Sequence, residues 1–202
     1  TAVREKGVHG AAAQGYDVAD FCKAFAEAGY VTLVPIRETP EGSDNGDEAV
    51  EEGLAASRAA VAFLMARTSL DPARIAYVGF SEGGLIGLWA MAKVEGLAAG
   101  AIMSPATMGG RRARAERYNQ MAFVRNGAAE GIAKPVFLSM ATDDNRSIMN
   151  WVPRTRRALE QAGVKLTYRD TYDGDHKMFQ SPRELFMKDI LSFLSANMGG
   201  SP

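Results

Sequence analysis

A serine flanked by glycines is the feature of this chain that points most directly to chemistry. Residues 79–83 read Gly-Phe-Ser-Glu-Gly, after a strand-like run at 74–78 and before an apolar helical pattern near Leu85. A serine on a sharp turn from strand to helix is held in a strained backbone conformation that small neighbours tolerate. Its hydroxyl lies at a helix N-terminus, where the helix dipole and backbone amides favour developing negative charge. The pattern predicts that Ser81 is a nucleophile.

A serine nucleophile needs a base, and the sequence contains two histidines. His9 lies upstream of Ser81, whereas the elbow motif predicts the order Ser, then Asp or Glu, then His. His176 follows a strand pattern at 165–168 and lies in a polar loop beside Gly174. An imidazole within hydrogen-bond reach of Ser81 would remove its proton. We therefore predict His176 as the base.

The third group is a carboxylate that orients the imidazole. It is expected after the strand at 134–140, because functional groups of open α/β sheets gather at the carboxyl ends of the strands. Asp143 and Asp144 both follow this strand. One of them should accept the hydrogen bond from the imidazole, and the other should serve a turn or cap the helix near Ser147. The residues themselves leave the choice between the two aspartates open.

These motifs resemble the α/β-hydrolase superfamily, and within it the dienelactone-hydrolase-like group and the catalytic domains of prolyl-oligopeptidase-type peptidases. The resemblance runs from His9 to about Leu194. It is strongest at residues 71–84, at the Asp-Asp-Asn turn of 143–145 and at Gly-Asp-His of 174–176. The resemblance implies a Ser-Asp-His serine hydrolase.

Two residue assignments depend on this resemblance. In the peptidase relatives the similar turn carries the acid at the first of two aspartates, which favours Asp143 over Asp144. The dienelactone hydrolases proper have a cysteine nucleophile where this chain has Ser81. The resemblance therefore implies ordinary ester chemistry in place of the namesake reaction.

The oxyanion hole of such a hydrolase needs two backbone donors. One is expected to be the amide of Glu82, directly after the nucleophile. In related hydrolases the other comes from a loop that reads His-Gly followed by small residues, which residues 9–12 resemble. We assign the second donor to the amide of Ala11, with His9 orienting the loop. A small-residue turn without a catalytic role is the alternative.

Strand patterns alternate with helical patterns, which predicts an α/β fold with a mostly parallel sheet covered on both faces. The length of 202 residues and the 47% hydrophobic content suit one domain, 1–202. The resemblance implies an α/β-hydrolase fold with reduced N-terminal strands and no large lid. The expected strands lie at 30–36, 74–78, 98–104, 134–140 and 165–168, and the expected helices at 17–28, 47–68, from about 85, 112–125, 148–161 and 183–197.

Residues 1–7 should form the strand that leads into the His-Gly loop, yet half of them are charged. Such a segment suits a buried central parallel strand poorly. Either the strand is degenerate, or residues are absent near this point of the chain, and we favour the second. The first two antiparallel strands of the family are also missing, which implies a reduced sheet.

The substrate pocket is expected to be open, because about thirty residues between Ser104 and Pro135 leave room for a loop and a short helix. Small or solvent-borne acyl groups therefore suit it better than long lipids. Arg111 begins a group of arginines that could bind a substrate carboxylate or form a solvated helix face. The candidates for the acyl pocket are Met108, Met149, Trp151 and Met178, although Met and Trp more often fill the core.

The net charge of −1 gives no indication of nucleic acid or an anionic membrane as partner. No apolar stretch reaches the length of a membrane span and no signal peptide is visible, although a chain that begins at Thr1 could have lost one. Cys22 is the single cysteine of the sequence, so an internal disulfide is excluded. Its side chain is expected to pack in a helix. We expect an esterase acting on a small ester without cofactor or metal. A dienelactone-type lactonase, a peptidase and a non-catalytic binding protein are the alternatives.

Overall fold

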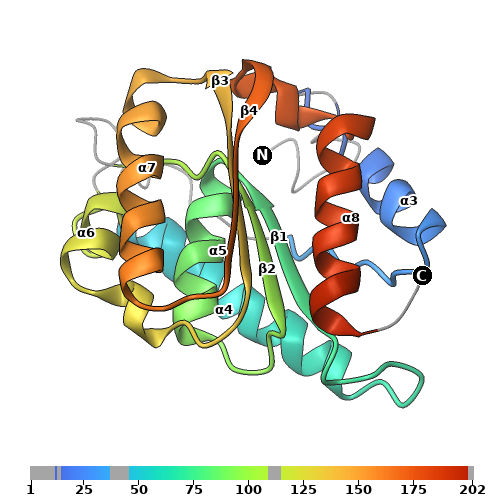
Figure 1. The fold of residues 1–202 in the computed structure, drawn as a ribbon. Coiled ribbons are helices and arrows are strands. Elements are labelled where there is room, and N and C mark those ends of the chain that lie inside the picture. Colours follow the sequence, from blue (N-terminus) through green and yellow to red (C-terminus); the bar gives the residue numbers. More distant parts are fainter. Residues whose placement is uncertain (1–11, 13–14, 37–45, 109–114, 200–202) are drawn as a thin grey trace.

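A parallel sheet of four strands forms the centre of the computed structural model, which describes residues 12, 15–36, 46–108 and 115–199 (Figure 1). The strands are β1 (Ala76–Phe80), β2 (Ala99–Met103), β3 (Val136–Asp143) and β4 (Leu166–Asp175), in the spatial order β1-β2-β3-β4. All three strand pairs are parallel. The carboxyl ends of the four strands therefore meet at one edge of the sheet.

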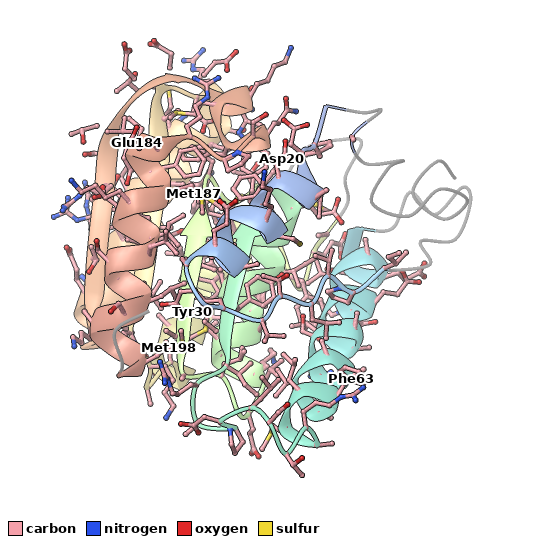
Figure 2. The ribbon with its side chains drawn as sticks, turned by 90° about the vertical axis from the view of Figure 1, so that its right-hand side faces the viewer. Asp20, Tyr30, Phe63, Glu184, Met187 and Met198 are labelled. Atoms are coloured by element: carbon pink, nitrogen blue, oxygen red, sulfur yellow. The ribbon has the colours of Figure 1, made fainter. Side chains whose placement is uncertain are left out.

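Helices cover both faces of this sheet. The helices are α3 (Val18–Glu27), α4 (Gly46–Met65), α5 (Glu82–Lys93), α6 (Gln120–Arg125), α7 (Arg146–Gln161) and α8 (Glu184–Met198), with 3-10 turns η1 (Ala128–Gly131) and η2 (His176–Gln180). Figure 1 shows α4, α5, α6 and α7 on one side of the strands and α3 and α8 on the other. Figure 2 looks onto the second side, where α3 and α8 lie in front of the sheet.

The alternation of side chains along the strands divides the interior into two cores. In β3, Leu138 and Met140 join the core beneath α4, α5 and α7, whereas Phe137 and Ala141 join the core beneath α3 and α8. β2 is buried along its whole length. Burial on both faces explains why the two inner strands, β2 and β3, read as nearly continuous apolar runs, whereas the edge strand β4 is mostly polar and partly exposed.

Most predicted elements are confirmed within a few residues, including the strand and helix on either side of Ser81. The helix predicted at 112–125 is shorter, and its first part, 112–114, lies outside the described residues. α6 begins at Gln120, because Asn119 accepts a hydrogen bond from the amide of Ala122 at 2.6 Å and caps the helix. The amides of residues 116–118 instead donate to the carboxylate of Asp47.

The strand predicted at 30–36 is wrong for the structure described. This segment has no regular secondary structure, and Val31 is 68% exposed. Strand backbone needs a neighbouring strand for its amides and carbonyls, and within the described ranges the sheet ends at β1. Residues 1–7, for which a strand leading into the His-Gly loop was expected, lie outside the described residues, so the prediction about that segment stays open.

Candidate active site

Each strand of the sheet is followed at once by a polar residue of the site. Ser81 comes directly after β1, Ser104 after β2, Asp144 after β3 and His176 after β4. Because all four strands are parallel, their carboxyl ends lie side by side and present these side chains at a common edge. The topology thus brings together residues that are far apart in the sequence.

Ser81 stands in a strained turn between β1 and α5. Its backbone has φ 54° and ψ −117°, a region that residues other than glycine rarely occupy. Hydrogen bonds to the turn after β2 hold it there: the Ser81 amide donates to the Met103 carbonyl at 3.1 Å, and the Ala106 amide donates to the Ser81 carbonyl at 2.7 Å. Strain of this kind persists where the surroundings fix the backbone, typically at functional sites.

The two glycines of the motif differ in what they contribute to this turn. A Cβ on Gly79 would lie 2.4 Å from the Gly83 carbonyl oxygen, so strand and helix can approach this closely only with glycine there. A Cβ on Gly83 would meet nothing within 4 Å. The expectation that both glycines permit close packing therefore holds for Gly79 but not for Gly83.

The Ser81 hydroxyl and the His176 imidazole are in hydrogen-bond contact, with Oγ 2.9 Å from Nε2. The other ring nitrogen, Nδ1, lies 2.8 Å from Oδ1 of Asp144. An ionised carboxylate only accepts hydrogen bonds, so Nδ1 carries the proton and Nε2 is left to accept from the serine. This is the arrangement in which an imidazole can take the serine proton.

The contact with the imidazole belongs to Asp144 and not to Asp143, contrary to the prediction. Asp143 is the last residue of β3, lies opposite Asp175 of β4 and is exposed. Successive side chains of a strand point to opposite faces, so the adjacent residue turns the other way. The side chain of Asp144 is fully buried beneath His176, which is 21% exposed.

Asp144 is surrounded by donors. The Ser104 hydroxyl donates to Oδ2 at 2.5 Å, and the Asn145 amide donates to Oδ1 at 2.7 Å. Burial by itself would raise the pKa of Asp144, but the hydrogen bonds from His176, Ser104 and Asn145, with the charge of His176, hold that pKa below its ordinary value. Asp144 is therefore ionised at neutral pH and can stabilise an imidazolium.

The structure describes only some of the other predicted site residues. Glu82 is the first residue of α5, and the oxyanion role predicted for its amide stays a prediction. Ala11, Arg111 and His9 lie outside the described residues, so their predicted roles stay predictions. Met108 is half-buried at the edge of the core and has φ 49°.

The pocket candidates downstream of Asp144 have other surroundings. Trp151, in α7, lies under the guanidinium of Arg154, whose Cζ is 4.6 Å from the ring centroid. Met149 is exposed on the same helix. Met178 is buried in the core on the α8 side of the sheet, which is the second of the two roles left open for it.

Ser104 was missed by the reasoning from sequence. It is fully buried, and its hydroxyl contacts the Asp144 carboxylate, which touches the imidazole. The available signal was its position, because it is the polar residue that ends the apolar run of β2. The same rule, applied to the true end of β3, selects Asp144.

Within the described ranges, no cluster of three or more His, Cys, Asp or Glu side chains is arranged to hold a metal ion. None of the helices in that part of the chain combines the length and apolar character needed to cross a membrane.

Several solved structures share this fold. Porphyromonas gingivalis dipeptidyl peptidase 4 is 19% identical, with a TM-score of 0.60 over 73% of this chain. Pyrococcus horikoshii acylaminoacyl peptidase is 16% identical, with a TM-score of 0.61 over 75% of this chain. The matches cover 23% and 28% of those two peptidase chains. Arabidopsis thaliana SOBER1 is 19% identical, with a TM-score of 0.56 over 82% of this chain and 72% of its own.

No curated protein matches the chain in sequence. The structural similarity and the parallel sheet with helices on both faces give the α/β-hydrolase fold, as predicted. The dienelactone hydrolase family matches residues 8–185, which include Ser81, Asp144 and His176. The chain therefore belongs to the dienelactone hydrolase family.

Proposed function

We propose that this chain is a serine hydrolase that cleaves carboxylic esters of small, soluble substrates through an acyl-enzyme on Ser81. One observation carries the proposal: Ser81 Oγ lies 2.9 Å from His176 Nε2, and His176 Nδ1 lies 2.8 Å from Asp144. Both distances are within the range for proton transfer by a general base and its orienting acid.

The proposed reaction has two halves. His176 takes the Ser81 proton while Oγ attacks the ester carbonyl, and the amides of Glu82 and Ala11 bind the resulting oxyanion. The imidazolium then protonates the departing alkoxide, which leaves an acyl group on Ser81. A water molecule, deprotonated by His176, attacks this acyl group and releases the acid. Asp144 stays ionised throughout and stabilises the imidazolium.

Ordinary esters are preferred over the namesake lactones because the nucleophile is serine and not cysteine. Small, soluble esters are preferred because the connection from β2 to β3 is short. In its described part this connection contributes only the short helix α6 and the turn η1. Such a connection supports an open site that suits soluble substrates. Amide hydrolysis is the second candidate, because two proteins with similar structures are peptidases. Lactone hydrolysis with Arg111 binding a carboxylate is a third candidate, supported by the family match.

Labelling with a small fluorophosphonate, read by intact mass and peptide mapping, tests the proposal without knowledge of the substrate. The folded protein should gain one adduct, located on Ser81, and Ser81→Ala and His176→Ala should gain none. A folded wild-type protein that gains no adduct would contradict the proposal and favour a non-catalytic binding protein.

Matched substrates separate the reactions. A p-nitrophenyl ester and the p-nitroanilide of the same acyl group differ only in the bond that is cleaved. We expect a higher kcat/KM for the ester, and a preference for the anilide would indicate a peptidase.

A further inference from the structure

Ser104 has no part in the reaction proposed above, yet it is the most constrained polar side chain near the site. It is fully buried and directly follows β2. Its φ of 39° lies in the left-handed region, which is uncommon for a residue with a side chain. Its amide donates to the Ser139 carbonyl at 2.7 Å, which anchors this backbone to β3. Features of this kind persist where the surrounding structure fixes them.

The Ser104 hydroxyl donates a charge-assisted hydrogen bond to the buried carboxylate of Asp144. It donates to Oδ2 at 2.5 Å, whereas Oδ1 faces His176 Nδ1 at 2.8 Å. The two carboxylate oxygens are thus divided between two partners. A carboxylate held at both oxygens cannot rotate about its Cβ–Cγ bond without losing a charge-assisted hydrogen bond.

The same turn also holds the nucleophile. Met103, immediately before Ser104, accepts the amide proton of Ser81, and Ala106 donates to the Ser81 carbonyl. Residues 103–106 are therefore hydrogen-bonded to the backbone of the nucleophile and to the side chain of the acid. Because the turn contacts both, it sets the distance that the imidazole must bridge.

We propose that Ser104 is a positioning residue: its hydroxyl fixes the Asp144 carboxylate so that Oδ1 faces His176, and its turn ties this carboxylate to Ser81. This inference deepens the proposed function and rests on it for its kinetic consequence. Ser104 acts through Asp144 and has no contact with substrate in this proposal. Its removal should therefore lower kcat and leave KM nearly unchanged.

The first experiment compares Ser104→Ala with Ser139→Ala. Ser139 is a matched control, because it is equally buried on the neighbouring strand and its Oγ has no hydrogen-bond partner among the described residues. Ser104→Ala should lower kcat about 10- to 100-fold, the scale of a small misplacement of catalytic groups. Ser139→Ala should keep the wild-type kcat.

Ser104→Gly separates the hydroxyl from the backbone strain. Glycine adopts φ 39° freely and lacks the hydroxyl, so it should lose as much kcat as alanine does. It also provides a folded variant if Ser104→Ala is unstable. Wild-type kcat in Ser104→Gly would overturn the proposal, because the backbone conformation and not the hydroxyl would then be what matters.

The position of Asp144 can also be tested by a measurement that does not depend on catalysis. Failure of the proposed function can then be distinguished from failure of this inference. The Nδ1 proton of His176 can be followed by NMR of protein labelled with ¹⁵N-histidine, and His9→Ala assigns the second histidine. Ser104→Ala and Ser104→Gly should shift this resonance and speed its exchange with water, whereas Ser139→Ala should not. If wild type is neither labelled nor active, the proposed function fails, and this resonance alone decides whether Ser104 positions Asp144. An unchanged resonance in both Ser104 variants would overturn the inference.

Discussion

The ring of Phe80 packs against the imidazole of His176, with the ring centroids 4.7 Å apart and the planes inclined by 39°. Phe80 is the last residue of β1 and precedes the nucleophile, so its ring holds the imidazole from the strand that carries Ser81. The same ring packs against that of Phe179, with the ring centroids 5.8 Å apart. Phe179 lies in the turn η2, which begins at His176. The imidazole is therefore held by the Phe80 ring that packs against it and by the Asp144 carboxylate that contacts Nδ1.

Replacing Phe80 by leucine should lower kcat about 2- to 10-fold, because an aromatic pair contributes about 0.5–1.5 kcal/mol beyond its buried area. Steady-state kinetics on an ester would measure this. Phe137→Leu is the control, since Phe137 packs on Phe193 in the core. It should reduce stability and leave kcat unchanged. Equal effects of the two substitutions on kcat would contradict a role for the Phe80 ring at the site.

The two aspartates after β3 should respond in opposite ways to the same substitution. Asp144→Asn removes the charge that stabilises the imidazolium and should lower kcat by about 10³- to 10⁴-fold. Asp143→Asn changes an exposed side chain and should keep kcat within about twofold of wild type. Kinetics of the two variants on one ester checks the assignment, which the reverse pattern would refute.

Asp144 should also make the stability of the fold depend on pH. Its pKa lies below the ordinary value of 3.8, because hydrogen bonds from His176 and Ser104 outweigh the effect of burial. A carboxyl with a lowered native pKa stabilises the fold above its unfolded pKa, and this contribution is lost as pH falls through the native pKa. Urea unfolding between pH 5 and pH 2 should show the free-energy difference between wild type and Asp144→Asn shrinking with falling pH. A constant difference would contradict this linkage.

Alanine at the two motif glycines should have unequal effects. Gly79→Ala places a Cβ 2.4 Å from the Gly83 carbonyl oxygen and should disrupt the turn, with loss of fluorophosphonate labelling. Gly83 lies in α5, and a Cβ there would point into open space. Gly83→Ala should therefore leave the stability of the fold unchanged or raise it by up to about 1 kcal/mol. Thermal unfolding and labelling rates measure both effects. If Gly83→Ala folds but loses activity, the open space belongs to the substrate or the oxyanion.

Asp47 should matter for the segment that precedes α6. Its buried carboxylate accepts hydrogen bonds from the amides of Glu116, Arg117 and Tyr118 at 2.9–3.1 Å. In Asp47→Asn the side-chain NH₂ group, itself a donor, would face backbone amides that also donate. The substitution should therefore lower the free energy of unfolding by about 2–3 kcal/mol. Glu51→Gln is the control, because its pair with Arg117 is partly exposed and should contribute less than about 1 kcal/mol. Urea unfolding distinguishes them, and equal losses would argue against the Asp47 contacts.

Apart from the strand expected at 30–36, the sequence predicted the order of the helices and strands and two of the three contacting residues, because those signals are local. Apolar runs and helical periodicity mark the strands and helices, and Gly29 and Gly163, with φ of 82° and 73°, follow α3 and α7 as expected. The elbow motif and the position of His176 likewise lie within a few residues of a strand end.

The ends of the strands were less predictable, and the choice of acid depended on one of them. β3 continues to Asp143 because it pairs with β4, with irregular register between Ser139 and Asp143. No local pattern encodes this pairing, so the residues left the choice between the two aspartates open, and the resemblance to the peptidases then favoured Asp143. Ser104 was missed for a related reason, since its partner Asp144 lies 40 residues away in the sequence.

The placement of one site residue after each strand also has a consequence for folding. The Ser81 to His176 contact spans 95 residues and exists only when β1, β2, β3 and β4 have all paired. A partly folded chain in which the last strand has not paired has Ser81 in its turn but lacks the contact with His176. Labelling of Ser81 by the fluorophosphonate during refolding should therefore begin only when β4 pairs with the sheet. Before that point the chain should gain no adduct.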